Sequence, residues 1–253
     1  MLKGKFNIGI AVVAVAVFAI INILDQGGGS TSSRDVDRTP VAPNWAAIAA
    51  WPQIDAPLVE ARPDPNRRIT AIVLDDSGSM GGDMAAAKQA VIDALEAMSE
   101  TDRVAVVALN HGLVMPFRAV GDARSVLPGS LSGVVSEGST PLTGAMQRAR
   151  ALLEDEASQV RGFGTFRMIV TTDGIADDSA ALRQAVRDLA GETPIQLTTI
   201  GIGIGGSHVL RREDLGSFVD VSNVDALRGA LQDAVAENTD FTAITDFTTA
   251  EEG

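Results

Sequence analysis

The chain has 253 residues, which is enough for one sizeable hydrophobic core with flanking segments. Its 33 acidic residues outnumber 20 basic ones and give a formal net charge of −13, so the surface repels phosphate backbones and we expect no nucleic-acid partner. The sequence contains no cysteine and only two histidines, which excludes disulfides and thiolate chemistry and leaves too few ligands for a usual zinc site.

A short basic segment, residues 1–5, precedes an uncharged run at residues 6–24. As a helix this run would extend about 28 Å, close to the thickness of the hydrocarbon core of a bilayer. The run ends without the small residues of an A-x-A cleavage pattern, so we expect a retained transmembrane anchor, with a cleaved signal peptide as the alternative. The two lysines before it favour a cytoplasmic N-terminus, which would place the rest of the chain in the periplasm or the exterior.

The segments that flank the expected domain differ in composition. Residues 25–44 are rich in Gly, Ser and Pro, which predicts a flexible linker. In residues 45–66, which lead into the domain, a short amphipathic helix is predicted by the three-residue spacing of Trp45, Ile48 and Trp51. We expect this helix to dock on the domain, with the membrane surface as the alternative. Residues 238–253 lack basic residues and helical periodicity, which predicts a mobile acidic tail.

Residues 67–237 alternate short apolar runs with amphipathic segments. The runs predict buried strands at 69–74, 104–109, 166–171, 195–202 and 218–221, and an antiparallel strand at 113–120. Apolar residues spaced by three and four predict helices after Asp83, after Pro141, around Val186 and around Leu231, and a short helix is expected within 121–139. The expected caps of three of these helices are Asp83, Thr140 and Ser222. This alternation predicts an α/β fold, a doubly wound and mainly parallel sheet with helices on both faces.

Oxygen-bearing side chains follow two of the predicted strands. Asp75, Ser77 and Ser79 come directly after the strand at 69–74, and alternate side chains of an extended segment point the same way. Asp173 follows the strand at 166–171, and if these strands are neighbours, about 4.8 Å apart, the two carboxylates converge. A hard cation would relieve their repulsion, and carboxylate, hydroxyl and water oxygens are the ligands that Mg²⁺ prefers, with Ca²⁺ or Mn²⁺ also suitable.

Three motifs in this order resemble the von Willebrand factor type A domain. They are D-x-S-x-S at residues 75–79, G-x-T-P at residues 138–141 and T-D-G at residues 172–174. The resemblance covers roughly residues 67–237 and implies a Rossmann-like, six-stranded sheet whose third strand is antiparallel. Together with the N-terminal anchor, it points to the bacterial, membrane-anchored type of such proteins.

In that family these motif positions form a metal-ion-dependent adhesion site. The resemblance therefore implies that Ser77, Ser79 and Thr140 bind the ion directly or nearly so. Asp75 and Asp173 would act directly or through water. An acidic side chain of a partner protein would then fill the open coordination position.

Parts of this segment are also similar to hydrolytic sites, but we expect no enzymatic activity. Asp75-Asp76-Ser77 lacks the second aspartate that an aspartyl-phosphate phosphohydrolase needs two residues after its nucleophile. A serine hydrolase needs a base beside its nucleophile, whereas His111 is expected in a hairpin turn and His208 in a polar loop.

The sequence therefore predicts a membrane-tethered module that binds a divalent cation and, through it, a partner protein with an exposed Asp or Glu. An accessory or scaffold subunit of a bacterial membrane complex, related to chaperones or pili, is the first alternative. A metal-dependent hydrolase is the second, and it would need a base near the ion.

Overall fold

The computed structural model describes residues 40–52, 67–205 and 208–236. The anchor predicted at residues 6–24 and the tail predicted at residues 238–253 lie outside this part of the chain. Within the described ranges, no helix combines the length and the apolar character needed to cross a bilayer.

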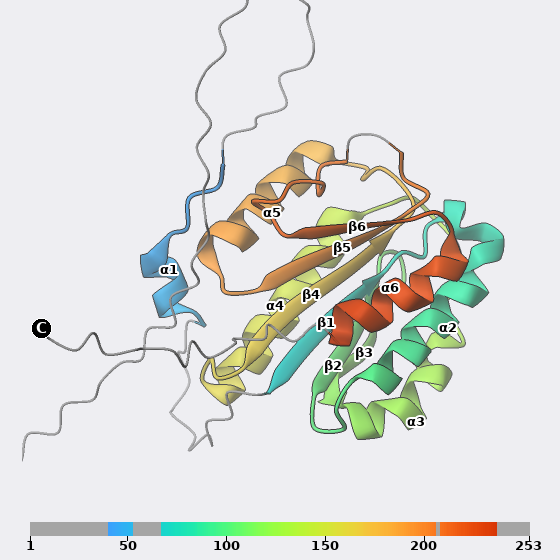
Figure 1. Cartoon of the computed structure of the whole chain (residues 1–253), viewed down its shortest axis with the longest axis horizontal. Coiled ribbons are helices and arrows are strands. Elements are labelled where there is room, and N and C mark those ends of the chain that lie inside the picture. Colours follow the sequence, from blue (N-terminus) through green and yellow to red (C-terminus); the bar gives the residue numbers. More distant parts are fainter. Residues whose placement is uncertain (1–39, 53–66, 206–207, 237–253) are drawn as a thin grey trace, which may run out of the picture. The chain divides into compact units, whose positions relative to one another are not determined.

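One sheet of six strands forms the centre of the fold, in the order β3-β2-β1-β4-β5-β6 (Figure 1). The strands are β1 (Arg68–Leu74), β2 (Arg103–Ala108), β3 (Gly112–Ala119), β4 (Thr165–Thr172), β5 (Gln196–Ile202) and β6 (Ser217–Val221). All neighbours are parallel except β3, which runs antiparallel to β2. The predicted doubly wound, mainly parallel sheet is confirmed. Its order reverses at β1, so a crevice opens at the carboxyl ends of β1 and β4, where ligands bind in such sheets.

Helices cover both faces of the sheet, with α2, α3 and α6 on one face and α4 and α5 on the other (Figure 1). The helices are α1 (Trp45–Ala50), α2 (Met84–Ala94), α3 (Val120–Leu131), α4 (Leu142–Val160), α5 (Ser179–Glu192) and α6 (Val224–Ala236), with 3₁₀ segments η1 (Gly78–Asp83) and η2 (Leu95–Ala97). Alternate residues of β1 enter opposite cores: Ile72 packs on the side of α2, and Ala71 and Val73 on the side of α4. Burial on both faces explains why β1 is an uninterrupted apolar run.

Helix α3 is longer than the short helix expected within residues 121–139. It spans Val120–Leu131 although it contains Gly121, Gly129 and Pro128. Its buried positions are spaced by three and four residues: Val120, Ala123, Leu127 and Leu131. Burial of this stripe against the core outweighs the poor helix propensity of glycine and proline, which local composition alone does not show.

Two of the three expected helix caps are wrong, and the third, Asp83, lies at the N-cap position of α2 without a capping hydrogen bond. Asp83 has helical backbone angles at the end of η1 and makes no capping hydrogen bond to α2. Helix α4 begins after Pro141 rather than after Thr140, again without a side-chain cap. Helix α6 is capped one residue later than expected, by Asn223, whose Oδ1 accepts from Ala226 N at 3.2 Å.

The helix expected at Trp45 to Trp51 is present as α1, but none of its residues is buried. Helix α1 lies against α5, and the residues on either side of it also contact the domain. Asn44 N donates to Gly191 O at 2.7 Å, and the Trp51 ring lies edge-on to Phe166 with 4.8 Å between centroids. Segment 40–52 is therefore docked on the domain, as expected, and the contacts at its two ends add to those of α1 with α5.

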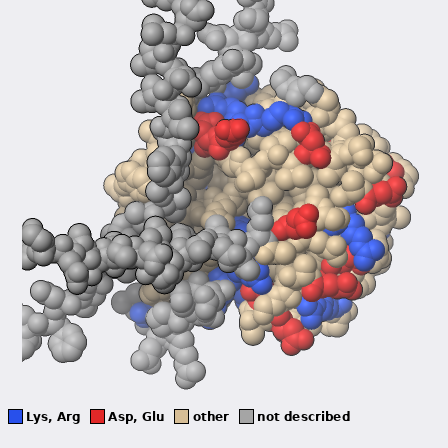
Figure 2. Space-filling view, viewed as in Figure 1, with Lys and Arg blue, Asp and Glu red and all other residues tan. Residues whose placement is uncertain are grey.

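Acidic and basic side chains are interspersed on the face shown in Figure 2. Lys and Arg lie there in small groups between Asp and Glu, and much of the remaining surface is uncharged. This face therefore presents no continuous basic surface of the kind that follows a phosphate backbone.

Candidate metal centre

The carboxylates of Asp75 and Asp173 lie at the carboxyl ends of two adjacent parallel strands. The register of β1 on β4 pairs Val73 with Val170, so both chains leave the sheet at the same edge. Asp75 is fully buried, and its Oδ1 accepts from Ser77 N at 2.9 Å. Its Oδ2 accepts from Asp173 N at 3.3 Å. The prediction that these two strands are neighbours is confirmed, and their pairing brings Asp75 and Asp173 together.

The two serine hydroxyls complete a chain of contacts between these strand ends. Ser77 has extended backbone angles, and the 3₁₀ turn η1 that follows brings Ser79 back toward it. Ser77 Oγ and Ser79 Oγ lie 3.1 Å apart, and Ser79 Oγ donates to Asp173 Oδ1 at 2.8 Å. Four of the five predicted ligands thus belong to one hydrogen-bonded group.

Thr140 reaches the same crevice from the loop before α4. Gly78 N donates to Gly138 O at 3.1 Å, and a Cβ on Gly78 would lie only 3.2 Å from that carbonyl. Glycine at position 78 therefore permits the two loops to approach closely. The Thr140 hydroxyl lies 3.6 Å from the place of a Cβ on Gly174, directly after Asp173. The structure thus places Thr140 beside the other four residues.

Two further side chains hold these loops, and sequence reasoning missed both. Asp177 accepts from Thr140 N at 3.0 Å and from Ser139 Oγ at 2.5 Å. Ser136 Oγ donates to Ser77 O at 2.7 Å and accepts from Gly81 N at 2.9 Å. The sequence could have indicated Asp177, because it is a carboxylate only four residues after Asp173. The contacts of Ser136 join segments distant in the chain, so only the structure shows them.

Electrostatics at the crevice favour a cation. Burial raises the pKa of Asp173, the charge of Asp75 raises it further, and the hydrogen bond from Ser79 opposes the shift. A cation between the two carboxylates would remove the conflict. Within the described ranges there is no group of three or more His, Cys, Asp or Glu side chains placed to hold a metal, so an ion here would also need hydroxyl and water oxygens. That donor set fits a hard divalent cation.

The two histidines lie in different surroundings from those expected. His111 lies in the turn between β2 and β3, as predicted, but its Nδ1 is 2.6 Å from the Asp76 carboxylate. His208 was expected in a polar loop, yet it is only 7% exposed. Burial lowers the pKa of His208, and its Nδ1 accepts from Leu210 N at 3.2 Å. Neither contact engages a serine hydroxyl of the crevice.

Residues 70–176 match the model of the von Willebrand factor type A domain family. No curated protein sequence matches the chain. Similar solved structures include a von Willebrand factor type A protein from Catenulispora acidiphila, 21% identical with a TM-score of 0.58 over 68% of this chain and 42% of that one. Proximal thread matrix protein 1 from mussel byssus, with a zinc-occupied MIDAS motif, is 18% identical with a TM-score of 0.56 over 70% of this chain and 48% of that one.

A third similar structure is the vWF domain of the type V pili tip protein Mfa5 from Porphyromonas gingivalis. It is 12% identical, with a TM-score of 0.53 over 68% of this chain and 95% of that one. At such identities these similarities show the fold. The matched part of this chain corresponds to less than half of the Catenulispora and mussel proteins.

Proposed function

We propose that this chain, which contains a von Willebrand factor type A domain, binds a divalent cation and uses it to bind a partner protein. The proposed ligands are Asp75, Ser77, Ser79, Thr140 and Asp173. The observation that supports this most is the series of hydrogen bonds from Ser77 through Ser79 to Asp173. The Asp75 carboxylate joins the same group, because it accepts from the backbone N of Ser77 and of Asp173. Mg²⁺ fits these oxygen donors best, with Ca²⁺ or Mn²⁺ as alternatives.

The surroundings of the crevice support a protein as the ligand. Ile175, two residues after Asp173, is 70% exposed, and Val135, in the loop that leads to Thr140, is 51% exposed. Large aliphatic side chains beside a polar crevice are typical of surfaces that proteins contact. We expect the partner to offer an exposed Asp or Glu to the cation and an apolar side chain to Ile175.

We also propose that residues 6–24 tether the domain to a membrane, with residues 25–44 as the linker. The domain would then face the periplasm or the exterior. The apolar length of residues 6–24 and the basic residues before them support this arrangement.

Titration of the full-length chain with Mg²⁺ and Mn²⁺, followed by calorimetry and by thermal unfolding, tests the cation site. At cation concentrations about 100-fold above Kd, binding should raise the unfolding midpoint by about 5–10 °C, because it stabilises the folded state by about 2.7 kcal/mol. Asp75→Ala should abolish both the binding and the shift. The control Asp122→Ala, which removes an exposed carboxylate on α3, should leave them unchanged. A wild-type chain that binds none of Mg²⁺, Mn²⁺ or Ca²⁺ would contradict the proposal.

Cross-linking in intact membranes tests the partner. Cross-links made in Mg²⁺ should disappear with EDTA and with Asp75→Ala. Ile175→Ser should weaken them while leaving cation affinity intact, because it removes an exposed apolar side chain and changes no charge. Cross-links that survive both EDTA and Asp75→Ala would show that the cation does not mediate the contact.

A further inference from the structure

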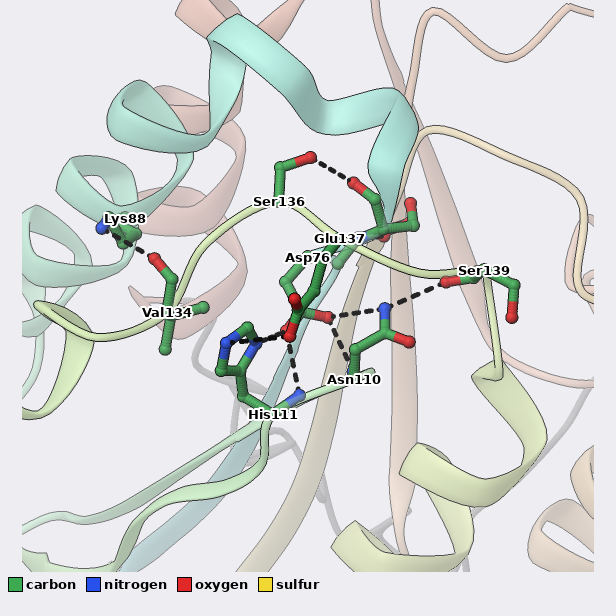
Figure 3. Close-up of polar contacts among 10 residues, drawn as sticks. Asp76, Lys88, Asn110, His111, Val134, Ser136, Glu137 and Ser139 are labelled. Carbon is green, nitrogen blue, oxygen red and sulfur yellow. Dashed lines mark hydrogen bonds and ion pairs between the residues drawn. The ribbon is translucent and has the colours of Figure 1, made fainter.

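Asp76 lies between two proposed ligands in the sequence, yet its carboxylate contacts a different part of the fold. It is fully buried. Oδ1 accepts from Asn110 N at 2.8 Å and from Asn110 Nδ2 at 3.3 Å. Oδ2 accepts from His111 N at 3.1 Å and lies 2.6 Å from His111 Nδ1. Figure 3 shows the amide of Asn110 and the imidazole of His111 both turned toward this carboxylate. All four contacts therefore come from the turn between β2 and β3.

The sheet explains why this turn meets Asp76. Strand β2 pairs in parallel with β1, and Leu109 N continues the pairing by donating to Leu74 O at 3.2 Å. Asn110 and His111 therefore leave the sheet beside Asp76. Beyond the end of β1, the Asp76 carboxylate contacts the turn that follows β2, whereas the Asp75 carboxylate accepts from Asp173 N, which follows β4. The two adjacent aspartates thus have different surroundings, and the sequence motif, which selects Asp75, does not show what Asp76 contacts.

The same group of residues contacts the loop that supplies Thr140. Asp76 O accepts from Glu137 N at 2.9 Å, and Asn110 Nδ2 donates to Ser139 O at 3.0 Å. His111 Nε2 lies 3.4 Å from Glu137 Oε1. A Cβ on Gly138 would lie only 2.5 Å from Asn110 Oδ1, so the loop is packed closely on the turn.

Other contacts hold the loop as well, and its later half is also held by Asp177 and by Gly78, whose N donates to Gly138 O at 3.1 Å. Lys88 Nζ donates to Val134 O at 3.0 Å, and Ser136 Oγ donates to Ser77 O at 2.7 Å (Figure 3). Asp76 and Asn110 hold the half nearest Thr140 from the side of β2, through Glu137 N and Ser139 O. Asp76 therefore lies at the junction between the segment of Ser77 and Ser79 and the segment of Thr140.

We propose that Asp76 and His111 are positioning residues that set the cation affinity of the site without contacting the ion. This inference rests on the proposed cation binding. Contacts to a buried carboxylate are among the stronger ones in proteins, and loss of one leaves a buried oxygen without its partner. The loop would then shift relative to Ser77 and Ser79. Groups that orient metal ligands in this way typically contribute 10–100-fold in affinity.

Two substitutions of His111 separate this role from general stability. His111→Phe keeps a ring and removes the Nδ1 contact, whereas His111→Asn keeps an amide donor near the position of Nδ1. For the full-length chain titrated with Mn²⁺ by calorimetry, we expect about ten-fold weaker binding for His111→Phe. His111→Asn should bind within about three-fold of the wild-type chain because it keeps the contact to Asp76.

Charge does not account for the expected loss. A neutral imidazole replaced by phenyl changes no charge, and loss of an imidazolium would strengthen cation binding. Weaker binding by His111→Phe therefore indicates altered geometry. In EDTA, the amide of Glu137 should also exchange faster in this variant, because the carbonyl of Asp76 no longer holds it as firmly.

Asp102→Asn is the matched control. Asp102 is buried too, and it accepts from Ser99 N at 2.9 Å and pairs with Arg68 at 2.7 Å, just before the amino end of β2. We expect a lower unfolding midpoint in EDTA and unchanged Mn²⁺ affinity. Equal weakening of Mn²⁺ binding in this control, or wild-type affinity in His111→Phe, would overturn the inference alone. No Mn²⁺ binding by the wild-type chain would overturn the proposed function, and the inference with it.

Discussion

At Asp173, burial and the nearby charge of Asp75 both disfavour the charged carboxylate. Asp173 is partly buried, and its pKa is raised first by that burial and then by the charge of Asp75. Its folded-state pKa thus exceeds the unfolded value, so the charged carboxylate destabilises the fold at pH values above the folded pKa. That penalty is absent at lower pH, where the group is protonated in both states.

Asp173→Asn should therefore stabilise the domain in EDTA at neutral pH. We expect a gain of at most about 1 kcal/mol, or about 2–4 °C in the unfolding midpoint, because the carboxamide has no charge to bury or to repel Asp75 and solvent screens part of the effect. The gain should shrink as the pH falls through the pKa of Asp173, and the stabilisation by added cation should be lost. Thermal unfolding with and without EDTA measures both effects. A destabilised variant in EDTA at neutral pH would contradict this account.

In the segment at residues 40–52, the residue that follows helix α1 packs more closely on the domain than the helix itself does. Helix α1 buries none of its residues, whereas Trp51 packs edge-on against Phe166 at the start of β4. Trp45, in the first turn of the same helix, is 59% exposed. The two tryptophans have the same chemistry, so burial alone distinguishes their contributions.

Replacement of each tryptophan by alanine tests this difference. Trp51→Ala should lower the free energy of unfolding by about 2 kcal/mol, below the range for a fully buried aromatic residue, since Trp51 is only half-buried. Trp45→Ala should change it by less than about 0.5 kcal/mol. Chemical denaturation measures both. Equal losses in the two variants would show that α1 packs through its own face.

At the scale of the whole molecule, two features bear on what the protein meets: its net negative charge and the apolar run at residues 6–24. The net charge of −13 favours cations and basic partners over phosphate backbones. Residues 6–24 would place this acidic domain at a membrane.

Fractionation of cells that express the chain tests the tether. The full-length chain should sediment with membranes and retain its N-terminal mass, and deletion of residues 6–24 should release it while leaving Mn²⁺ binding unchanged. A released chain that has lost its first 25 to 30 or so residues would instead indicate a cleaved signal peptide, whose usual length is about 15–30 residues.

Local sequence determined the elements and the chemistry of the candidate site. The apolar stripes of α2 and α4 follow directly from helical spacing, and their predicted positions are buried, from Met84 to Val91 and from Leu142 to Leu153. Leu95 and Met98, expected in the same helix as Met84, are buried too but lie in and after η2. The spacing of Asp75, Ser77 and Ser79 along one extended segment likewise depends only on neighbours in the chain.

Tertiary structure decided the features that depend on contacts distant in sequence. Strand order brought Asp173 to Asp75 and placed His111 beside Asp76, and no local pattern shows that Asp76 meets this histidine. Burial of its apolar stripe extended α3 through Pro128, against its composition. The physical reason is common to these cases: spacing along the chain sets which way a side chain points, but only the packed sheet sets what it meets there.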